Sequence, residues 1–192
     1  MAVARTAVEL PIAASRFIGR TAELAEVETA LRRARVVSVV GPGGIGKTRV
    51  ALEVARRRVR RSGSVWVADL STISDARLVT NVLAAAAGLA AVETITDVVQ
   101  ALADAAGLVV LDNCEHVVDA AAVAVLALVE GCPRLRVLTT TREALRISGE
   151  TVIPLGSLDA DDAIRLFAER ARAVRADAVE GQQEAVSELC TR

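Results

Sequence analysis

Aromatic side chains are almost missing from this chain of 192 residues, which has two phenylalanines, one tryptophan and no tyrosine. Proteins that bind single-stranded nucleic acid without sequence preference stack the bases on aromatic rings. The formal net charge at pH 7 is −1, so the chain as a whole offers no electrostatic attraction for a phosphate backbone either. We therefore expect no direct contact with nucleic acid.

Cysteines are few, and apolar runs are short. The three cysteines form no C-x-x-C pair, which argues against a disulfide framework and against a zinc site: Cys114, Cys132 and Cys190. The longest apolar runs are about half the length that a membrane span needs. Arg5 and Glu9 interrupt the N-terminal stretch, so it lacks the continuous apolar core of a secretory signal. These features predict a cytoplasmic protein with no membrane partner.

Lysine occurs once. Lys47 is the only lysine among 23 lysines and arginines, and it lies in the stretch GPGGIGKT at 41–48. An arginine would carry the same charge on a wide planar fork, whereas an ammonium group is a compact point donor. The single lysine therefore indicates a narrow cradle of backbone groups that only the smaller donor fits.

Strand-like and helix-like segments alternate along the chain. A helical apolar period covers 22–33, and the β-branched run RVVSVV follows at 35–40. A segment rich in helix formers then runs from Lys47 to Gly63. Four further strand-like runs are separated by helical material: 65–70, 108–112, 136–140 and 151–155. The alternation predicts an α/β fold with a parallel sheet flanked by helices, and Pro154, which cannot donate to a ladder, predicts an edge position for the last strand.

The glycine-rich stretch matches the phosphate-binding pattern G-x-x-x-x-G-K-[ST], with Gly41, Gly46, Lys47 and Thr48 at the defining positions. It lies between a buried strand and a helix, where backbone N–H groups converge on a phosphate. Lys47 would reach the β- and γ-phosphates, and the Thr48 hydroxyl would ligate Mg²⁺. The predicted nucleotide-binding set from this P-loop is Gly41, Pro42, Gly43, Gly44, Ile45, Gly46, Lys47, Thr48 and Arg49.

Four more residues are candidates for chemistry at the phosphates. The apolar run LVVLD ends in Asp112, which suits a carboxylate that holds Mg²⁺. Asn113 could orient an attacking water but cannot accept its proton, whereas Glu115 could be the base or a surface turn residue. Arg142 follows a threonine-rich strand end and could sense a γ-phosphate or be solvated. Together with Lys47, these residues form the predicted catalytic set.

Five segments, taken in order, resemble the nucleotide-binding domain of STAND-class signalling ATPases: FIGR (17–20), GPGGIGKTRVALEVA (41–55), VLDNCEH (110–116), VLTTTRE (137–143) and the stretch from IPL to DAIRLF (153–167). The resemblance is greatest to the NB-ARC-like ATPase module of bacterial LuxR-type and AfsR/SARP-type transcriptional regulators, and it extends from about Arg16 to the end of the chain. It implies the strand order 5-1-4-3-2, which would bring Arg142 to the γ-phosphate. It also implies an adenine clasp at Phe17, Ile18, Gly19 and Arg20.

The resemblance further implies a switch. In such domains ADP holds a closed form, and ATP exchange permits self-association and output through sensor and effector domains, which here would lie outside the chain. Asn113 stands where many relatives carry a second acidic residue, which predicts slow hydrolysis. The family's Gly-Leu-Pro-Leu motif does not occur, so we expect the helical lid to continue beyond Arg192. The predicted division is an N-terminal segment with the clasp at 1–34, a P-loop NTPase core at 35–158, and the start of the helical lid at 159–192.

The most specific expectation is thus a switch that binds ATP or ADP with Mg²⁺ and hydrolyses ATP slowly. Two other classes stay open. A small-molecule phosphotransferase would need an acceptor pocket and a lid, and no obvious insertion between the Asp112 strand and the next strand supplies them. A DNA-associated ATPase or loader would need positive charge and aromatic rings, which the composition lacks.

Overall fold

The computed structural model describes residues 16–61, 63–90 and 92–174. Within these ranges the chain falls into two compact units. The larger unit comprises 22–155, and the smaller one joins 16–21 to the residues from 156 onward. The larger unit contains the whole sheet.

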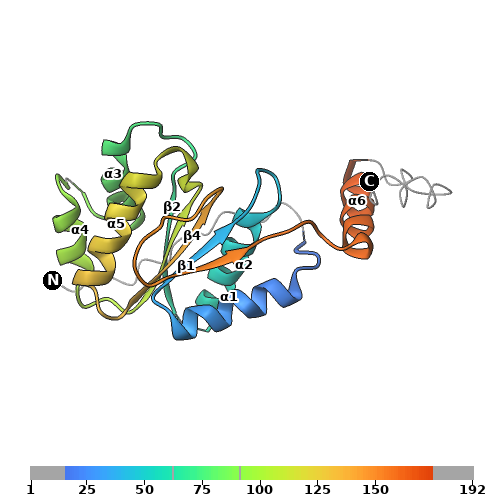
Figure 1. Cartoon of the computed structure of the whole chain (residues 1–192), viewed down its shortest axis with the longest axis horizontal. Helices are drawn as coiled ribbons and strands as arrows, with labels where there is room; N and C mark the ends of the chain where they lie inside the picture. The colour runs from blue at the N-terminus through green and yellow to red at the C-terminus, as the bar shows by residue number, and fades with distance from the viewer. Residues whose placement is uncertain (1–15, 62, 91, 175–192) are drawn as a thin grey trace. The chain divides into compact units, whose positions relative to one another are not determined.

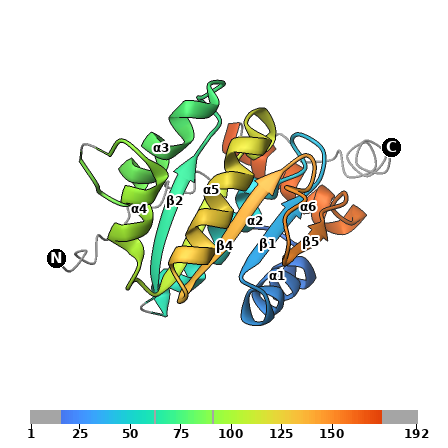
Figure 2. The same ribbon diagram turned by 60° about the vertical axis from the view of Figure 1, so that its left-hand side comes forward.

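Five parallel strands form this sheet: β1 Val36–Val40, β2 Ser64–Asp69, β3 Gly107–Asp112, β4 Leu135–Thr141 and β5 Glu150–Pro154. They follow the order β2-β3-β4-β1-β5, and each neighbouring pair is parallel. Figure 2 shows β2, β4, β1 and β5 in this sequence across the sheet. All five strands lie where the sequence predicts them, and their order is the 5-1-4-3-2 arrangement that the resemblance implies. β3 is buried along its whole length, as expected for a strand covered on both faces. β5 pairs only with β1, so the edge position predicted from Pro154 is confirmed.

Helices cover both faces of the sheet. They are α1 Thr21–Arg33, α2 Lys47–Arg60, α3 Val79–Ala86, α4 Ile95–Leu102 and α5 Val118–Gly131, with short 3₁₀ turns η1 Ala76–Leu78 and η2 Cys114–His116. Figure 1 shows α1 and α2 on one side of the sheet and α3, α4 and α5 on the other. The chain moves from β1 to β2 in one direction across the sheet and returns through β3 to β4 in the other. Since such crossovers are right-handed, the helices of the two halves must lie on opposite faces.

The main core lies between the sheet and the face formed by α3, α4 and α5. Its largest fully buried side chains are leucines from both layers: Leu70, Leu102, Leu111, Leu128 and Leu135. Each such side chain stabilises the fold by about 1.5–3 kcal/mol relative to an exposed position. Cys114 and Cys132 are free buried thiols, and burial raises the pKa of Cys114 to about 12. Cys190 lies outside the described residues.

Two arginines close the C-terminal ends of helices. Arg35 donates to the carbonyl oxygens of Val129 (2.5 Å) and Cys132 (2.6 Å) at the end of α5. Arg136 donates to the carbonyl oxygen of Ala34, just after α1, at 3.0 Å. The last carbonyls of a helix have no partner within the helix, so a cationic donor there is stabilising. Part of the arginine content is therefore structural.

The segment that joins β4 to β5 contains no helix, and Glu150 ties it to the sheet. The Glu150 carboxylate accepts hydrogen bonds from the backbone N–H groups of Leu145 (3.0 Å) and Arg146 (2.8 Å). It also accepts one from the Ser38 hydroxyl, which in turn accepts one from Thr139 at 2.7 Å. Ser38 and Thr139 are fully buried, so this chain of hydrogen bonds satisfies polar groups inside the sheet.

The smaller unit contains the FIGR motif and α6 Ala160–Val174. Arg20 is buried in a left-handed conformation and donates to the carbonyl oxygens of Gly156 (2.6 Å) and Ser157 (3.2 Å). Gly19 also has a positive φ of 69°, and an added Cβ would lie 2.2 Å from the Asp162 carboxylate. Among the described residues, the FIGR motif thus belongs to the same compact unit as α6.

No helix in the described part of the chain is long and apolar enough to span a membrane. The helical pattern predicted beyond α6 falls on 175–192, which lies outside the described residues.

Candidate functional site

The P-loop joins the end of β1 to the start of α2. Gly44 and Gly46 have φ values of 76° and 101°, which L side chains rarely adopt, and an added Cβ on either would meet nothing within 4 Å. The backbone therefore curves around open space at these two positions. At Gly41 an added Cβ would lie 2.7 Å from the carbonyl oxygen of Leu155, so this glycine is required by packing. No side chain caps α2, whose N-terminus faces the loop.

Lys47 lies inside this loop. Its Nζ donates hydrogen bonds to the carbonyl oxygens of Gly41 (2.9 Å) and Pro42 (3.0 Å), and the residue is 6% exposed. The ammonium is thus held by backbone carbonyls in a narrow cradle, as predicted from its being the only lysine. Both carbonyls are on the loop itself, so a phosphate that entered the loop would find the ammonium already beside it.

Asp112 is the most heavily hydrogen-bonded carboxylate of the site. Its Oδ1 accepts from the hydroxyls of Thr48 (2.9 Å) and Thr140, and its Oδ2 accepts from the side-chain amide of Asn113 (3.0 Å). Burial raises the pKa of Asp112, while the hydrogen bonds from Thr140 and Thr48 act to lower it, and the charges of Asp69 and Glu115 raise it further. A bound cation would relieve this desolvation of the negative charge.

The Thr48 hydroxyl and the Asp112 carboxylate fit the requirements of Mg²⁺. The ion prefers hard oxygen ligands and is usually held by one or two protein groups together with water and substrate phosphates. In the described residues no group of three or more His, Cys, Asp or Glu side chains could hold a metal by itself. Magnesium ligation by Thr48 and Asp112 remains a prediction, in which nucleotide phosphates would supply further oxygen ligands.

Asn113 joins two strand ends. It adopts a left-handed conformation (φ 62°), which asparagine tolerates better than most residues. Its backbone N–H donates to the Thr140 hydroxyl at 2.9 Å, and its amide donates to Asp112 and, at 3.2 Å, to Oδ1 of Asp69. Asp69 is not among the site residues predicted from the sequence. The signal was present, because the run VWVAD ends in an aspartate just as LVVLD does.

Arg142 lies over the P-loop. Its Nη2 is 3.3 Å from the position that a Cβ on Gly43 would occupy, and its Nε pairs with Oε1 of Glu115 at 3.3 Å. The Arg142 side chain is 60% exposed and that of Glu115 only 11%. The second oxygen of Glu115 is buried and has no hydrogen-bond partner among the described residues. The two residues that the sequence proposed as sensor and base therefore contact each other beside the phosphate loop.

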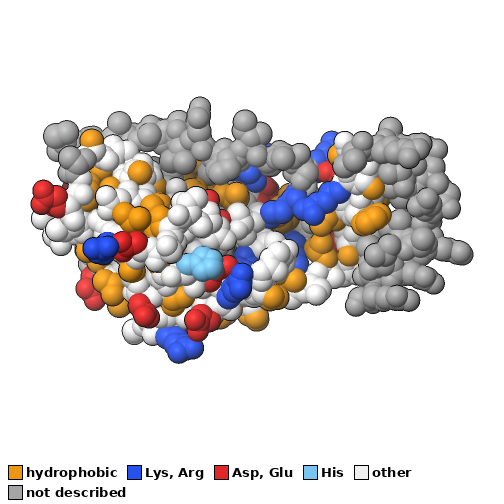
Figure 3. All heavy atoms as spheres, turned by 90° about the horizontal axis from the view of Figure 1, so that it is seen from above, with side chains coloured by type: hydrophobic (Ala, Val, Ile, Leu, Met, Phe, Trp, Pro, Cys, Tyr) orange, Lys and Arg blue, Asp and Glu red, His pale blue; other side chains and the backbone are white. Residues whose placement is uncertain are grey.

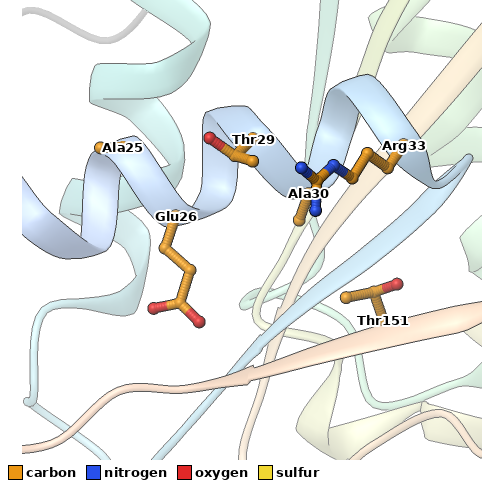
Figure 4. A pocket seen from close by; sticks show the side chains of 6 residues that line it. All are labelled: Ala25, Glu26, Thr29, Ala30, Arg33 and Thr151. Atoms are coloured by element: carbon orange, nitrogen blue, oxygen red, sulfur yellow. The ribbon is translucent and has the colours of Figure 1, made fainter.

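Hollows on the larger unit include one beside the site and one away from it. One, of about 450 Å³, is lined by residues 115–120 and 143–146 together with Ala76, and thus adjoins Glu115. His116, the only histidine, is exposed on its rim and is the pale blue group in Figure 3. The other, of about 470 Å³, is a groove along α1 and β5 that none of the P-loop residues lines (Figure 4): Ala25, Glu26, Thr29, Ala30, Arg33 and Thr151.

Comparison with known proteins places this geometry among nucleotide-binding domains. A family profile described as AAA ATPase domain matches residues 16–186. An uncharacterized protein of Mycobacterium tuberculosis is 39% identical over 187 residues, which cover 92% of this chain and 47% of that protein. A candidate HTH-type transcriptional regulator of the same species is 36% identical over 168 residues, which cover 84% of this chain and 19% of that protein. The chain thus spans about half or less of the length of these relatives.

Solved structures share the fold at low identity. A STAND protein with a tetratricopeptide repeat sensor from Pyrococcus horikoshii has a TM-score of 0.56 at 19% identity. The matched region covers 91% of this chain and 28% of that protein. Cdc6p from Pyrobaculum aerophilum has a TM-score of 0.63 at 14% identity, and the matched region covers 88% of this chain and 52% of that protein. DnaA from Aquifex aeolicus, bound to AMPPCP, has a TM-score of 0.57 at 14% identity, and the matched region covers 91% of this chain and 57% of that protein.

Proposed function

The chain belongs to the family of AAA ATPase domains, and from this premise we propose that it is the ATP- and ADP-binding switch module of a larger signal-transduction protein. The P-loop and Lys47 would hold the phosphates, and Thr48 and Asp112 would hold Mg²⁺. When bound, the ion neutralises the charge on the β- and γ-phosphates. The finer assignment to the NB-ARC-like group of LuxR-type and AfsR/SARP-type regulators is part of the same proposal.

The observation that carries the switch is the position of Arg142. Its guanidinium lies beside Gly43 of the P-loop and is held there by the Glu115 carboxylate. A third phosphate in the loop would offer this guanidinium a more highly charged partner than Glu115, whereas ADP would leave the ion pair as it is. The presence or absence of a γ-phosphate would thus decide which partner Arg142 takes.

Slow hydrolysis follows from the same contacts. The Asn113 amide is already engaged by two carboxylates, and Glu115 is paired with Arg142. Glu115 is therefore not free to accept a proton from water until Arg142 has moved, and the Asn113 amide cannot accept one. General-base assistance is typically worth about 10²- to 10⁴-fold in rate, so its absence in the resting site favours long-lived nucleotide states.

Control of transcription would be exerted through domains outside this chain. The relative described as a candidate HTH-type regulator is much longer than the matched segment, and the STAND protein of similar fold carries a repeat sensor. These likenesses support a module that passes its nucleotide state to linked sensor and effector domains. Nucleotide-dependent self-association of the whole protein belongs to the same proposal.

The test compares affinities for ATP and ADP. We expect Arg142→Ala to weaken Mg²⁺–ATP binding by about 10- to 100-fold, the equivalent of one lost charge-assisted hydrogen bond, and to leave ADP binding unchanged. Arg146→Ala is the control, because Arg146 is an exposed arginine of the same connecting segment and pairs only with the exposed Glu143 among the described residues. Equal effects on ATP and ADP, or no effect on either, would overturn the assignment of Arg142.

A second candidate function is phosphoryl transfer to a small molecule. The hollow of about 450 Å³ beside Glu115 could receive an acceptor that the sequence analysis did not foresee. Incubation with γ-labelled ATP and a metabolite extract distinguishes the two functions. A switch releases labelled inorganic phosphate slowly and labels no organic product.

A further inference from the structure

Asp69 occupies a position that corresponds to that of Asp112. The two aspartates are partners in the register of β2 and β3, and each is the last residue of its strand. Asp112 is buried, whereas Asp69 is exposed. Partial burial acts to raise the pKa of Asp69, but hydrogen bonds from Ser71 and Asn113 outweigh it, and the pKa lies below its ordinary value. Asp69 is thus a second ionised carboxylate on the strand next to the one that carries Asp112.

The Asn113 amide connects the two carboxylates. Its Nδ2 donates to Oδ2 of Asp112 at 3.0 Å and to Oδ1 of Asp69 at 3.2 Å. Ionised carboxylates only accept hydrogen bonds, so both amide hydrogens must face them, and this fixes the orientation of the amide. An aspartate at position 113 would instead bring three negative charges together. The left-handed backbone and the amide bridge both favour asparagine here.

We propose that Asp69 is a positioning residue of the magnesium–nucleotide site and acts on Asp112 through Asn113. Asp69 holds the amide, the amide holds Oδ2 of Asp112, and Oδ1 is thereby left facing the Thr48 hydroxyl. Residues behind the direct ligands commonly set metal affinity in this way. The inference rests on the proposed function, because it needs a nucleotide whose binding depends on Mg²⁺.

A purely local role for Asp69 is the competing explanation. Its Oδ1 also accepts from the backbone N–H of Ser71 at 2.9 Å, which stabilises the turn after β2. Asp75 provides a matched control, because its carboxylate accepts from the backbone N–H of Arg77 at 3.0 Å in the same two-residue turn. The described contacts of Asp75 do not include Asn113 or Asp112.

The experiment measures ATP affinity of the 192-residue chain as a function of Mg²⁺ concentration for the parent, Asp69→Ala, Asp69→Asn and Asp75→Ala. We expect Asp69→Ala to raise the Mg²⁺ concentration for half-maximal tightening about 10-fold. We expect Asp75→Ala to leave it unchanged. Asp69→Asn keeps an acceptor for the Asn113 amide and should recover most of the loss. ADP affinity without Mg²⁺ should be the same in all four proteins.

Three results would overturn the proposal. One is a Mg²⁺ dependence in Asp69→Ala equal to that of the parent. Another is an equal loss of Mg²⁺-free ADP binding, which would place the effect in the turn. The third is an equal effect of Asp75→Ala. If the parent bound no nucleotide at any Mg²⁺ concentration, the proposed function itself would fall, and this inference with it.

Discussion

Replacement of Lys47 separates the chemistry of the P-loop from the stability of the fold. The Lys47 ammonium donates to two loop carbonyls, at 2.9 and 3.0 Å. With nucleotide bound, the same donors would reach phosphate oxygens. A hydrogen bond that involves a charged group contributes about 1.5–3 kcal/mol, so two of them amount to about 3–6 kcal/mol. We therefore expect Lys47→Ala to weaken ATP binding by about 10²- to 10⁴-fold.

Lys47→Arg tests the geometry rather than the charge. The guanidinium is wider than the ammonium, and the Lys47 position is only 6% exposed, so the larger fork cannot enter the same cradle. We expect the arginine variant to bind ATP nearly as weakly as the alanine variant. Isothermal titration calorimetry gives the affinities, and urea denaturation should show a change in the free energy of unfolding within about 1.5 kcal/mol for both variants. Parent-like ATP affinity in Lys47→Arg would refute the account of the single lysine.

Three further predictions concern the glycines with positive φ, the Glu150 carboxylate and the Asp112 carboxylate. Gly46→Ala and Gly149→Ala both force alanine into a positive φ without a clash. Each should therefore lower the free energy of unfolding by about 1–2 kcal/mol in urea denaturation. Only Gly46→Ala should also weaken ATP binding. Glu150→Gln offers a single acceptor oxygen to three donors and should lower the free energy of unfolding by about 1–3 kcal/mol in the same assay, whereas Glu143→Gln, at an exposed position, should leave it unchanged. Equal stability of the two variants would contradict the proposed role of the three hydrogen bonds to Glu150. Burial raises the pKa of Asp112 above its ordinary value in the folded chain, so the folded state holds this proton more tightly than the unfolded state. Without nucleotide, the stability of the chain should therefore fall as the pH rises from the ordinary pKa of an aspartate through the raised pKa of Asp112. Asp112→Asn should remove this fall and be more stable than the parent at neutral pH, while it weakens Mg²⁺-dependent ATP binding; a variant less stable than the parent would contradict the burial cost.

The local parts of the candidate site can be selected from the sequence. The P-loop is a contiguous motif, and the strands are short apolar runs whose ends are visible in the sequence, so Lys47, Thr48 and Asp112 could be selected without a structure. The position of Arg142 depends on the order of the strands, which the periodicity of apolar residues does not determine. That order came from the resemblance to a family, and the structure agrees with it.

Contacts between distant strand ends could not be predicted in the same way. The bridge from Asp69 through Asn113 depends on the register of β2 against β3, and a shift of one residue would have pointed Asp69 to the other face. The role of Glu150 depends on how the segment after β4 crosses the sheet, which no local pattern encodes. The adenine clasp remains a prediction, because the FIGR motif belongs to the smaller unit.

The most direct test of the central claim is equilibrium dialysis of the 192-residue chain against labelled ATP and Mg²⁺. The account predicts saturable binding of about one ATP per chain, displaced fully by unlabelled ADP and lost in Lys47→Ala. Absence of saturable binding up to millimolar ATP, or binding that Lys47→Ala leaves unchanged, would contradict it.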